Sequence, residues 1–182
     1  MNSAIPEEKM KVRWFVMRAY KSERIAEEKL TEKGIEFFVP KCYVIRVYHG
    51  VKSRKLVPAI QSLIFVHACH SEITDFKKQY NFLQFVIWEK STGREYLVVP
   101  DGQMENFIKV ASCYEEDVVY LNPDEIDLKK GTRVRIHGGM FDGVTGEFMR
   151  VQGKRNRRVV VMLDGLIAIA VEVHPDLVEV IS

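Results

Sequence analysis

Four of the chain's 11 glycines fall within nine positions, in the segment GGMFDGVTGEFMRV at residues 138–151. Such glycines occur in phosphate-binding loops, in tight β-turns and in small RNA-binding barrels. A phosphate-binding loop requires a helix after its glycines and follows GxGxxG or GxxxxGK[ST] spacing, whereas here a strand pattern follows and neither spacing is present. The segment therefore predicts a strand, a glycine turn and a second strand. Gly138, Gly139 and Gly143 take positive-φ or close-approach positions, and Phe141 packs under the turn.

Short strands are the only elements predicted for the last 55 residues or so. Turn signals at Gly153, Asp164-Gly165 and His174-Pro175 separate runs of apolar residues. Asp164-Gly165 between two such runs is a strong signal for a two-residue hairpin turn. Five short strands favour a small barrel, because closure removes exposed strand edges. The predicted strands span residues 132–137, 144–151, 158–163, 166–173 and 177–181.

The first 112 residues alternate strand and helix patterns instead. An aromatic strand pattern over residues 14–20 precedes a helix that Ser22 can cap and Gly34 can end. Two further helices are predicted, one capped by Ser71 and one opened by Pro100-Asp101, each with apolar residues along one face. The other predicted strands span residues 35–39, 43–48, 56–68 and 82–88.

The predicted order is therefore β-α-β-β-α-β plus an extra helix. This is the split β-α-β arrangement of ferredoxin-like α+β domains, in which helices cover one face of an antiparallel sheet. The uncovered face must then bind something or be buried. The predicted organisation is an N-terminal extension at 1–11, a first domain at 12–112, an acidic linker at 113–127 and a barrel domain at 128–182.

The charge distribution supports two domains. Residues 1–114 carry 18 Lys and Arg against 13 Asp and Glu, and residues 128–182 carry nine against six. Between them lie six acids and no base, at Glu115, Glu116, Asp117, Asp124, Glu125 and Asp127. Two mildly basic segments flanking an acidic connector suggest domains that meet an anionic partner, although a solvated charge run is the simpler explanation.

Several classes of protein are not expected from this sequence. No apolar run approaches the roughly 20 residues of a membrane helix, and no signal segment is recognisable, so we expect a cytoplasmic protein without a membrane partner. Cys42, Cys69 and Cys113 form no CxxC pair, which argues against disulfides and structural zinc. His67, Cys69 and His70 lack a fourth ligand nearby. No nucleophile motif or cofactor fingerprint is present, so we expect neither an enzyme nor a bound metal or cofactor.

The glycine segment and its flanks resemble a KOW motif, which forms an SH3-like β-barrel. The matching parts are the strand KGTRVRI at 130–136, the turn GGMFDG at 138–143 and the strand GEFMRV at 146–151. The family usually has Pro where this chain has Met140. KOW barrels occur in several translation and transcription proteins, so the motif alone does not choose among them.

The first half resembles the NGN domain of NusG/RfaH-type transcription elongation factors. The resemblance rests on the aromatic strand from Trp14, the helix ending at Gly34, IEFFVP at 35–40, a basic excursion and LIFV at 63–66. With the KOW segment it covers roughly residues 12–181. Housekeeping members usually carry Phe-Pro-Gly-Tyr where this chain has IQSL at 60–63. In this departure the chain most resembles the UpxY antiterminators of capsular polysaccharide operons.

The resemblance implies a partner and a contact surface. NGN domains place an apolar depression on the clamp helices of RNA polymerase and favour pause-free elongation. Carried over to this chain, the depression involves Ile60, Leu63, Phe65, Phe85 and Val98. Aromatic and aliphatic anchors would carry most of the binding energy. The alternative is that these side chains form core facing the helices, since an apolar run places side chains on both sheet faces.

Basic residues supply candidate nucleic-acid contacts. In the specialised relatives the corresponding surface touches non-template or upstream DNA; here that surface would use Lys21, Arg24, Arg46, Lys52, Arg54 and Lys55. A second basic group, Lys154, Arg155, Arg157 and Arg158, lies at a predicted barrel hairpin tip and could meet RNA or a ribosomal protein. For both groups a solvated loop is the competing interpretation. Strand-forming valines at 159–161 favour the barrel in the resting state.

The leading hypothesis is an antitermination factor that binds RNA polymerase. The first alternative is a general NusG-like factor whose barrel contacts Rho or ribosomal protein S10. The second is a translation module that binds RNA through the barrel alone, which would leave the NGN surface without a function. An enzyme remains a distant third, tested by turnover that is lost on mutating His67 or Glu116.

Overall fold

The computed structural model describes residues 10–90, 93–114, 118–122, 126, 131–163 and 166–181. The chain divides into two compact units, Met1–Asp101 and Gly102–Ser182. The predicted α+β class is confirmed: in these residues three α-helices accompany several antiparallel sheets. No helix within the described ranges is long and apolar enough to cross a membrane.

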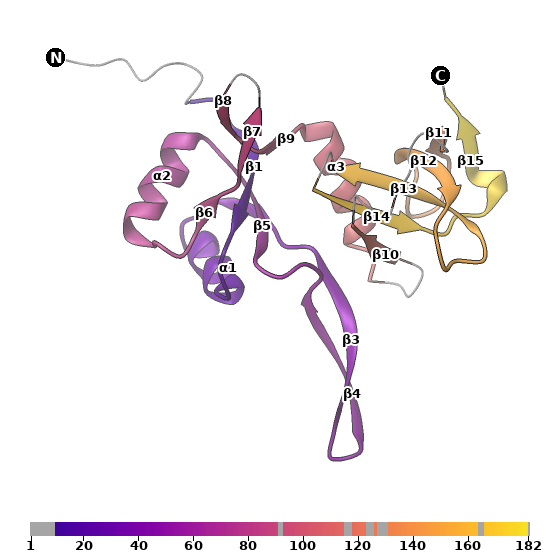
Figure 1. The fold of residues 1–182 in the computed structure, drawn as a ribbon, viewed down its shortest axis with the longest axis horizontal. Helices are drawn as coiled ribbons and strands as arrows, with labels where there is room; N and C mark the ends of the chain where they lie inside the picture. The colour runs from indigo at the N-terminus through magenta and orange to yellow at the C-terminus, as the bar shows by residue number, and fades with distance from the viewer. Residues whose placement is uncertain are drawn as a thin grey trace. The chain divides into compact units, whose positions relative to one another are not determined.

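The first unit is built on an antiparallel sheet with β1 at its centre (Figure 1). β1 pairs with β5 on one side and with β6 and β9 on the other, while β2 pairs with β5. Two helices, α1 and α2, belong to the same unit. The bounds are β1 Arg13–Arg18, α1 Glu23–Glu32, β2 Glu36–Phe38, β5 Leu63–Ala68, α2 His70–Gln79, β6 Gln84–Phe85 and β9 Val98–Val99.

Both helices pack on one face of this sheet. Ala26 and Leu30 of α1 and Ile73 and Phe76 of α2 share a buried cluster with sheet residues that include Met17. Alternation along each strand sends every second side chain to this face, and the four-residue spacing of Ala26 and Leu30 forms the matching helical stripe. The core of the first unit therefore lies between the sheet and its helices.

The predicted cap of the first helix is confirmed, whereas that of the second helix differs. Ser22 is the N-cap of α1, and Gly34 beyond its C-cap has φ +69°, as expected for glycine after a helix. The prediction that Ser71 caps the second helix is wrong. α2 begins at His70 with Cys69 as N-cap, because Cys69 has extended backbone and its carbonyl accepts a hydrogen bond from Ile73 N at 3.2 Å.

A long hairpin extends from the first unit. β3 (Lys41–Tyr48) and β4 (Val51–Pro58) pair along their whole length and with no other strand of the described residues, and Figure 1 shows them projecting away from the rest of the unit. The sequence predicted strands at 43–48 and 56–68 but not the pairing between them. A turn at residues 59–62 separates β4 from β5. A smaller hairpin joins β7 (Ile87–Lys90) to β8 (Gly93–Tyr96).

The second unit is a six-stranded antiparallel sheet in the order β10-β14-β13-β12-β11-β15, which forms the small barrel. The five barrel strands predicted from the sequence are all present. β10 lies inside the segment predicted as a linker and pairs with β14. The bounds are α3 Asp101–Ala111, β10 Val118–Leu121, β11 Thr132–Ile136, β12 Thr145–Arg150, β13 Arg157–Leu163, β14 Ile167–Val171 and β15 Val178–Val180, with a 3-10 turn at Pro175–Leu177.

Valine and isoleucine fill the barrel core. Val134, Ile136, Val159, Leu163 and Ile169 are all completely buried. β13 and β14 pair up to Leu163 and Ile167, and the predicted Asp164-Gly165 turn that would join them lies outside the described residues. So do Lys130 and the six acidic residues of the predicted linker.

Candidate functional site

Two of the predicted polymerase-binding residues share one face of the first sheet. Leu63 and Phe65 alternate along β5, where Phe65 pairs with Val16 and also lies opposite Phe38. Ile64 and Val66 between them belong to the helix-side core, so Leu63 and Phe65 lie on the face turned away from α1 and α2. Leu63 is 2% exposed and Phe65 is fully buried.

Two other predicted residues lie on the opposite face. Phe85 pairs with Met17 and Val98 with Phe15, and both pack against the helix-side core. Directly paired residues of neighbouring strands project to the same side of a sheet. The structure therefore brings Leu63 and Phe65 together and separates them from Phe85 and Val98.

Ile60 lies in the turn that leads into β5. Its side chain is half-buried, and its carbonyl accepts a hydrogen bond from Leu63 N at 3.4 Å. Ser62 in the same turn has φ +65°, and its backbone N donates to the Glu23 carboxylate at 2.6 Å. Glu23 thus holds the turn in place, which positions Ile60 at the start of the strand that carries Leu63 and Phe65.

A stacked histidine lies on the same face as Phe65. The His67 ring lies 4.6 Å from the ring of Trp14, nearly parallel to it, and its Nδ1 is 2.5 Å from Glu36 Oε2. Asp101 Oδ1 is 3.9 Å from Nε2 on the other side of the ring. Within the described ranges, no group of three His, Cys, Asp or Glu side chains is arranged to hold a metal ion.

An aromatic cluster that the sequence did not single out lies on the helix side. The rings of His70, Phe85 and Tyr96 lie 4.6–5.2 Å from one another, and Phe15 meets Phe85 edge-on at 5.5 Å. Lys77 Nζ lies 4.7 Å from the Phe85 ring, and burial lowers the pKa of this ammonium group. The cluster accounts for Phe85 as a packing residue of the first unit.

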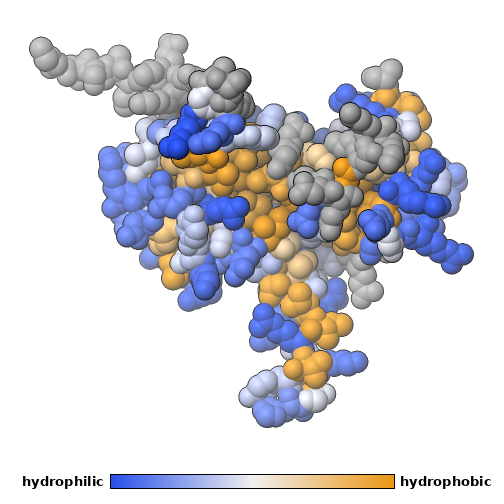
Figure 2. All heavy atoms as spheres, in the orientation of Figure 1, coloured by the Kyte–Doolittle hydropathy of each residue, from blue (hydrophilic) through white to orange (hydrophobic). Residues whose placement is uncertain are grey.

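The β3–β4 hairpin carries four of the predicted nucleic-acid contacts on two faces. The register places Lys52 and Arg54 on the face of Ile45 and Val47, whereas Arg46 and Lys55 lie on the other face. All four basic residues are exposed, and so are Ile45 at 70% and Val47 at 63%. Figure 2 shows hydrophobic and hydrophilic residues side by side along this hairpin.

The first of these faces also holds a cation over an aromatic ring. The Arg54 guanidinium lies 3.9 Å from the centroid of Tyr43. At the base of the hairpin, Lys41 Nζ forms an ion pair with Glu27 Oε2 at 2.6 Å, which ties β3 to α1. Burial raises the pKa of the Cys42 thiol beside it. The sequence contains a signal from which this hairpin could have been predicted, since His49-Gly50 can occupy a two-residue turn.

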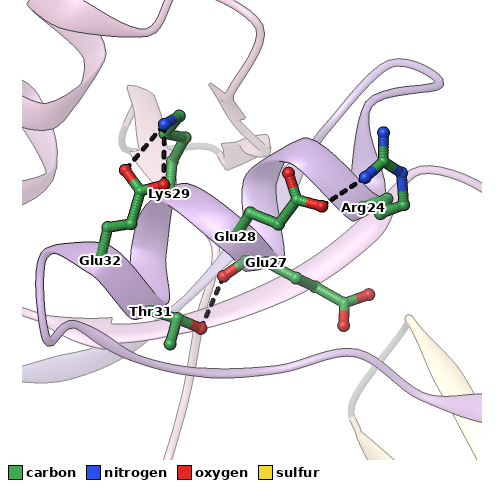
Figure 3. Close-up of polar contacts among 6 residues, drawn as sticks. All are labelled: Arg24, Glu27, Glu28, Lys29, Thr31 and Glu32. Carbon is green, nitrogen blue, oxygen red and sulfur yellow. Dashed lines mark hydrogen bonds and ion pairs between the residues drawn. The ribbon is translucent and has the colours of Figure 1, made fainter.

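Lys21 and Arg24 lie away from the hairpin strands. Lys21 stands in the turn before α1 with φ +62°, and its backbone N donates to Ser62 Oγ at 3.4 Å. Arg24 forms an ion pair with Glu28 one helical turn along α1, as Figure 3 shows. The predicted basic residues therefore lie on separate elements, with four on the hairpin, Arg24 on α1 and Lys21 in the turn before it.

The glycine turn of the barrel has the predicted backbone. Gly138, Gly139 and Gly143 have φ of +79°, +68° and +81°. The Asp142 carboxylate accepts a hydrogen bond from Gly138 N at 2.6 Å, and Val144 N donates to the carbonyl of Phe141 at 3.0 Å. Phe141 is half-buried. These bonds close the turn between β11 and β12.

The four basic residues predicted at the barrel tip differ in exposure and in the face of the strand on which they lie. Arg157 and Arg155 are exposed and Lys154 is half-buried. Arg158 is only 5% exposed, and its Nη2 forms an ion pair with Glu172 Oε2 at 2.9 Å. Adjacent strand residues project to opposite faces, which separates Arg158 from Arg157.

The chain is similar to one family model and to a solved structure. A family model described as "NusG: Transcription termination factor nusG" matches residues 12–108, more than half of the chain. A search among curated proteins finds no significant match. A solved structure described as "Domain interaction in Thermotoga maritima NusG" is similar at 24% identity and a TM-score of 0.46, covering 96% of this chain and 99% of that one. On the family match, this chain belongs to the NusG family of transcription factors.

Proposed function

We propose that the chain is a transcription elongation and antitermination factor that binds RNA polymerase at the clamp helices and promotes processive transcription. The observation that carries the proposal is the family match over residues 12–108, which spans the helices and strands of the ferredoxin-like first unit and extends into α3. The KOW-type glycine turn of the second unit supports the same assignment. We place the protein in the cytoplasm with the polymerase.

We infer further that it serves particular polysaccharide operons, as UpxY antiterminators do. The support is the sequence IQSL at 60–63, which replaces the Phe-Pro-Gly-Tyr of housekeeping members. Ser62 in this segment adopts a positive φ, a backbone that glycine takes at no cost. The segment thus combines an unusual turn with side chains that differ from those of the housekeeping members.

The contact surface proposed for the polymerase is narrower than the set predicted from the sequence. Ile60, Leu63 and Phe65 form a continuous stretch leading into β5, whereas Phe85 and Val98 pack with the helix-side core. Apolar anchors near the centre of an interface dominate its binding energy. We propose Ile60, which keeps exposed surface, as the anchor that contacts the polymerase, and the buried Leu63 and Phe65 as the strand residues that support it.

The test is binding of the purified protein to core RNA polymerase. Serine at Phe65 or Leu63 would remove core side chains, at a cost of about 2–5 kcal/mol each, and could unfold the unit. The half-buried Ile60 is the better position, and Ile25 of α1, 42% exposed, provides a matched control.

We expect Ile60→Ser to weaken binding about ten-fold or more, in line with loss of an interface anchor. Ile25→Ser should bind as the wild type does. Equal losses in both variants would place the contact elsewhere in the first unit. Failure of the wild type to bind core polymerase would overturn the proposed function itself.

The description of the matched family favours a second candidate, a general factor that acts in termination. Such a factor would couple the polymerase to Rho or to ribosomal protein S10 through the KOW barrel. Transcription on a template with a Rho-dependent terminator separates the two. The antiterminator raises read-through when added, whereas the general factor raises termination when Rho is present.

A further inference from the structure

The end of the barrel where β12 and β13 join carries an unusual pairing of charges. Arg150, the last residue of β12, lies directly opposite Arg157, the first residue of β13, and both side chains are exposed. Like charges directly opposite each other on neighbouring strands destabilise a sheet. Local arrangements that cost stability occur at functional sites, where a ligand can compensate for them.

Two further bases lie in the turn that joins these strands. Lys154 and Arg155 follow Gly153, which has φ +74°, and Lys154 N donates to the carbonyl of Val151 at 3.1 Å. The turn is therefore held by its own backbone. Figure 2 shows hydrophilic residues gathered over this end of the barrel.

The Glu172 carboxylate beside this turn already has hydrogen-bond partners. Glu172 accepts hydrogen bonds from Asn156 Nδ2 at 2.5 Å and from Arg158 Nη2 at 2.9 Å, so both of its oxygens have partners. Among the residues that the structure describes, no carboxylate forms an ion pair with Arg150, Lys154, Arg155 or Arg157. The charge of these four side chains is therefore left for a ligand to neutralise.

An aromatic ring accompanies the arginine pair. Phe148 lies two residues before Arg150 on the same face of β12, and the Arg157 guanidinium is 5.9 Å from its ring centroid. Phe148 is half-buried, so the residue keeps some exposed surface. Guanidinium groups bind phosphates through paired hydrogen bonds, and bases stack on aromatic and guanidinium planes. The combination suits a single-stranded nucleic acid better than it suits isolated carboxylates.

We propose that Arg150, Lys154, Arg155, Arg157 and Phe148 form a binding site for single-stranded RNA. The choice of RNA rests on the proposed function, because a factor on a transcribing polymerase works beside the emerging transcript. Arg158 is a positioning residue, since its ion pair with Glu172 holds the start of β13. Arg150, which was not among the predicted contacts, becomes one of the two central ones.

The test is fluorescence anisotropy of a labelled 20-nucleotide RNA of mixed sequence, titrated with the full chain in the absence of polymerase. We expect Arg150→Gln with Arg157→Gln to weaken affinity at least ten-fold at about 0.1 M salt. The slope of log K against log salt should fall by about 1.4, since each phosphate contact on a single strand contributes about 0.7. Phe148→Leu should weaken affinity about five-fold or more with the slope unchanged.

The matched control removes the same charge from the exposed side of β11, as Arg133→Gln with Arg135→Gln. It should change the affinity by less than about two-fold. If the Arg150 and Arg157 variant binds RNA as tightly as the wild type, the proposed site is wrong, and an acidic protein becomes the better candidate partner. If the control loses as much affinity, the proposed site is also wrong, because RNA then binds through diffuse positive charge.

Folding and polymerase binding separate this inference from the proposed function. The Arg150 and Arg157 variant removes a like-charge pair, so its melting temperature should equal or exceed that of the wild type. Its binding to core polymerase should be unchanged. If RNA binding is lost together with a lowered melting temperature, Arg150→Lys with Arg157→Lys, which keeps the charge, decides the case: a wild-type salt slope in this variant supports the site, and a reduced slope overturns it.

Discussion

Among single residues, the barrel glycines differ in the reason that each must be glycine. Gly138, Gly139 and Gly143 have positive φ, and a Cβ added there would meet no backbone atom within 4 Å. Gly146 has no positive φ, but a Cβ there would lie 2.6 Å from the Val160 carbonyl oxygen and 2.9 Å from Val159 Cγ1. Gly146 is therefore required by the close approach of β12 and β13.

We predict that Gly146→Ala lowers the free energy of unfolding by about 1–3 kcal/mol, the usual cost of overpacking a well-packed core. Gly102→Ala is the matched control, because Gly102 lies in α3 with open space around it. It should leave stability unchanged or raise it by up to about 1 kcal/mol. Urea denaturation measures both, and equal stability of the two variants would show that β13 shifts to accept the methyl group.

Among the elements, the β3–β4 hairpin combines a regular backbone with two unlike faces. His49 and Gly50 have φ of +47° and +78°, as a type I′ two-residue turn requires. This turn sets the register, and the register sorts the bases into two pairs. Only the face of Lys52 and Arg54 also carries a ring under a cation, that of Tyr43.

We predict that DNA binds chiefly to that face. Lys52→Gln with Arg54→Gln should weaken binding of a single-stranded DNA about five-fold or more and reduce its salt slope. Arg46→Gln with Lys55→Gln removes equal charge from the opposite face and should have a smaller effect. Electrophoretic mobility shifts at two salt concentrations measure both variants. Equal effects would mean that the hairpin attracts DNA by charge alone.

At the scale of the whole molecule, the second compact unit begins earlier than the predicted barrel domain. Asn106 Nδ2 of α3 donates to Thr145 Oγ1 at 3.1 Å, and Lys109 Nζ donates to the Asp142 carbonyl. Cys113 Sγ lies 3.4 Å from Met140 Sδ. α3 is thus anchored to the glycine turn and to β12 of the same unit.

We predict that a fragment of residues 102–182 is more stable than one of residues 128–182. The shorter fragment loses α3 and β10, and it leaves the outer edge of β14 unpaired. A loss of about 2 kcal/mol would lower the melting temperature by roughly 10 °C in a domain of this size. Circular dichroism melts of the two fragments measure the difference, and equal melting temperatures would support the boundary at residue 128.

Local patterns alone determined much of this molecule. Strand-forming valines between glycine turns act over a few residues, which is why all five barrel strands and the positive φ of Gly138, Gly139 and Gly143 were predictable. The helices followed from apolar spacing in the same way, except that α2 begins one residue before Ser71. The family resemblance likewise rested on short motifs and agrees with the match over residues 12–108.

Only the tertiary structure decided which side chains meet. Alternation shows that a strand has two faces, but pairing with distant strands determines which residues share one, so Phe65 and Phe85 could not be separated from the sequence. The same holds at the barrel tip, where Glu172 forms an ion pair with Arg158 and the strand register places Arg150 directly opposite Arg157. Secondary structure depends on neighbours along the chain, whereas these contacts depend on register between segments far apart in sequence.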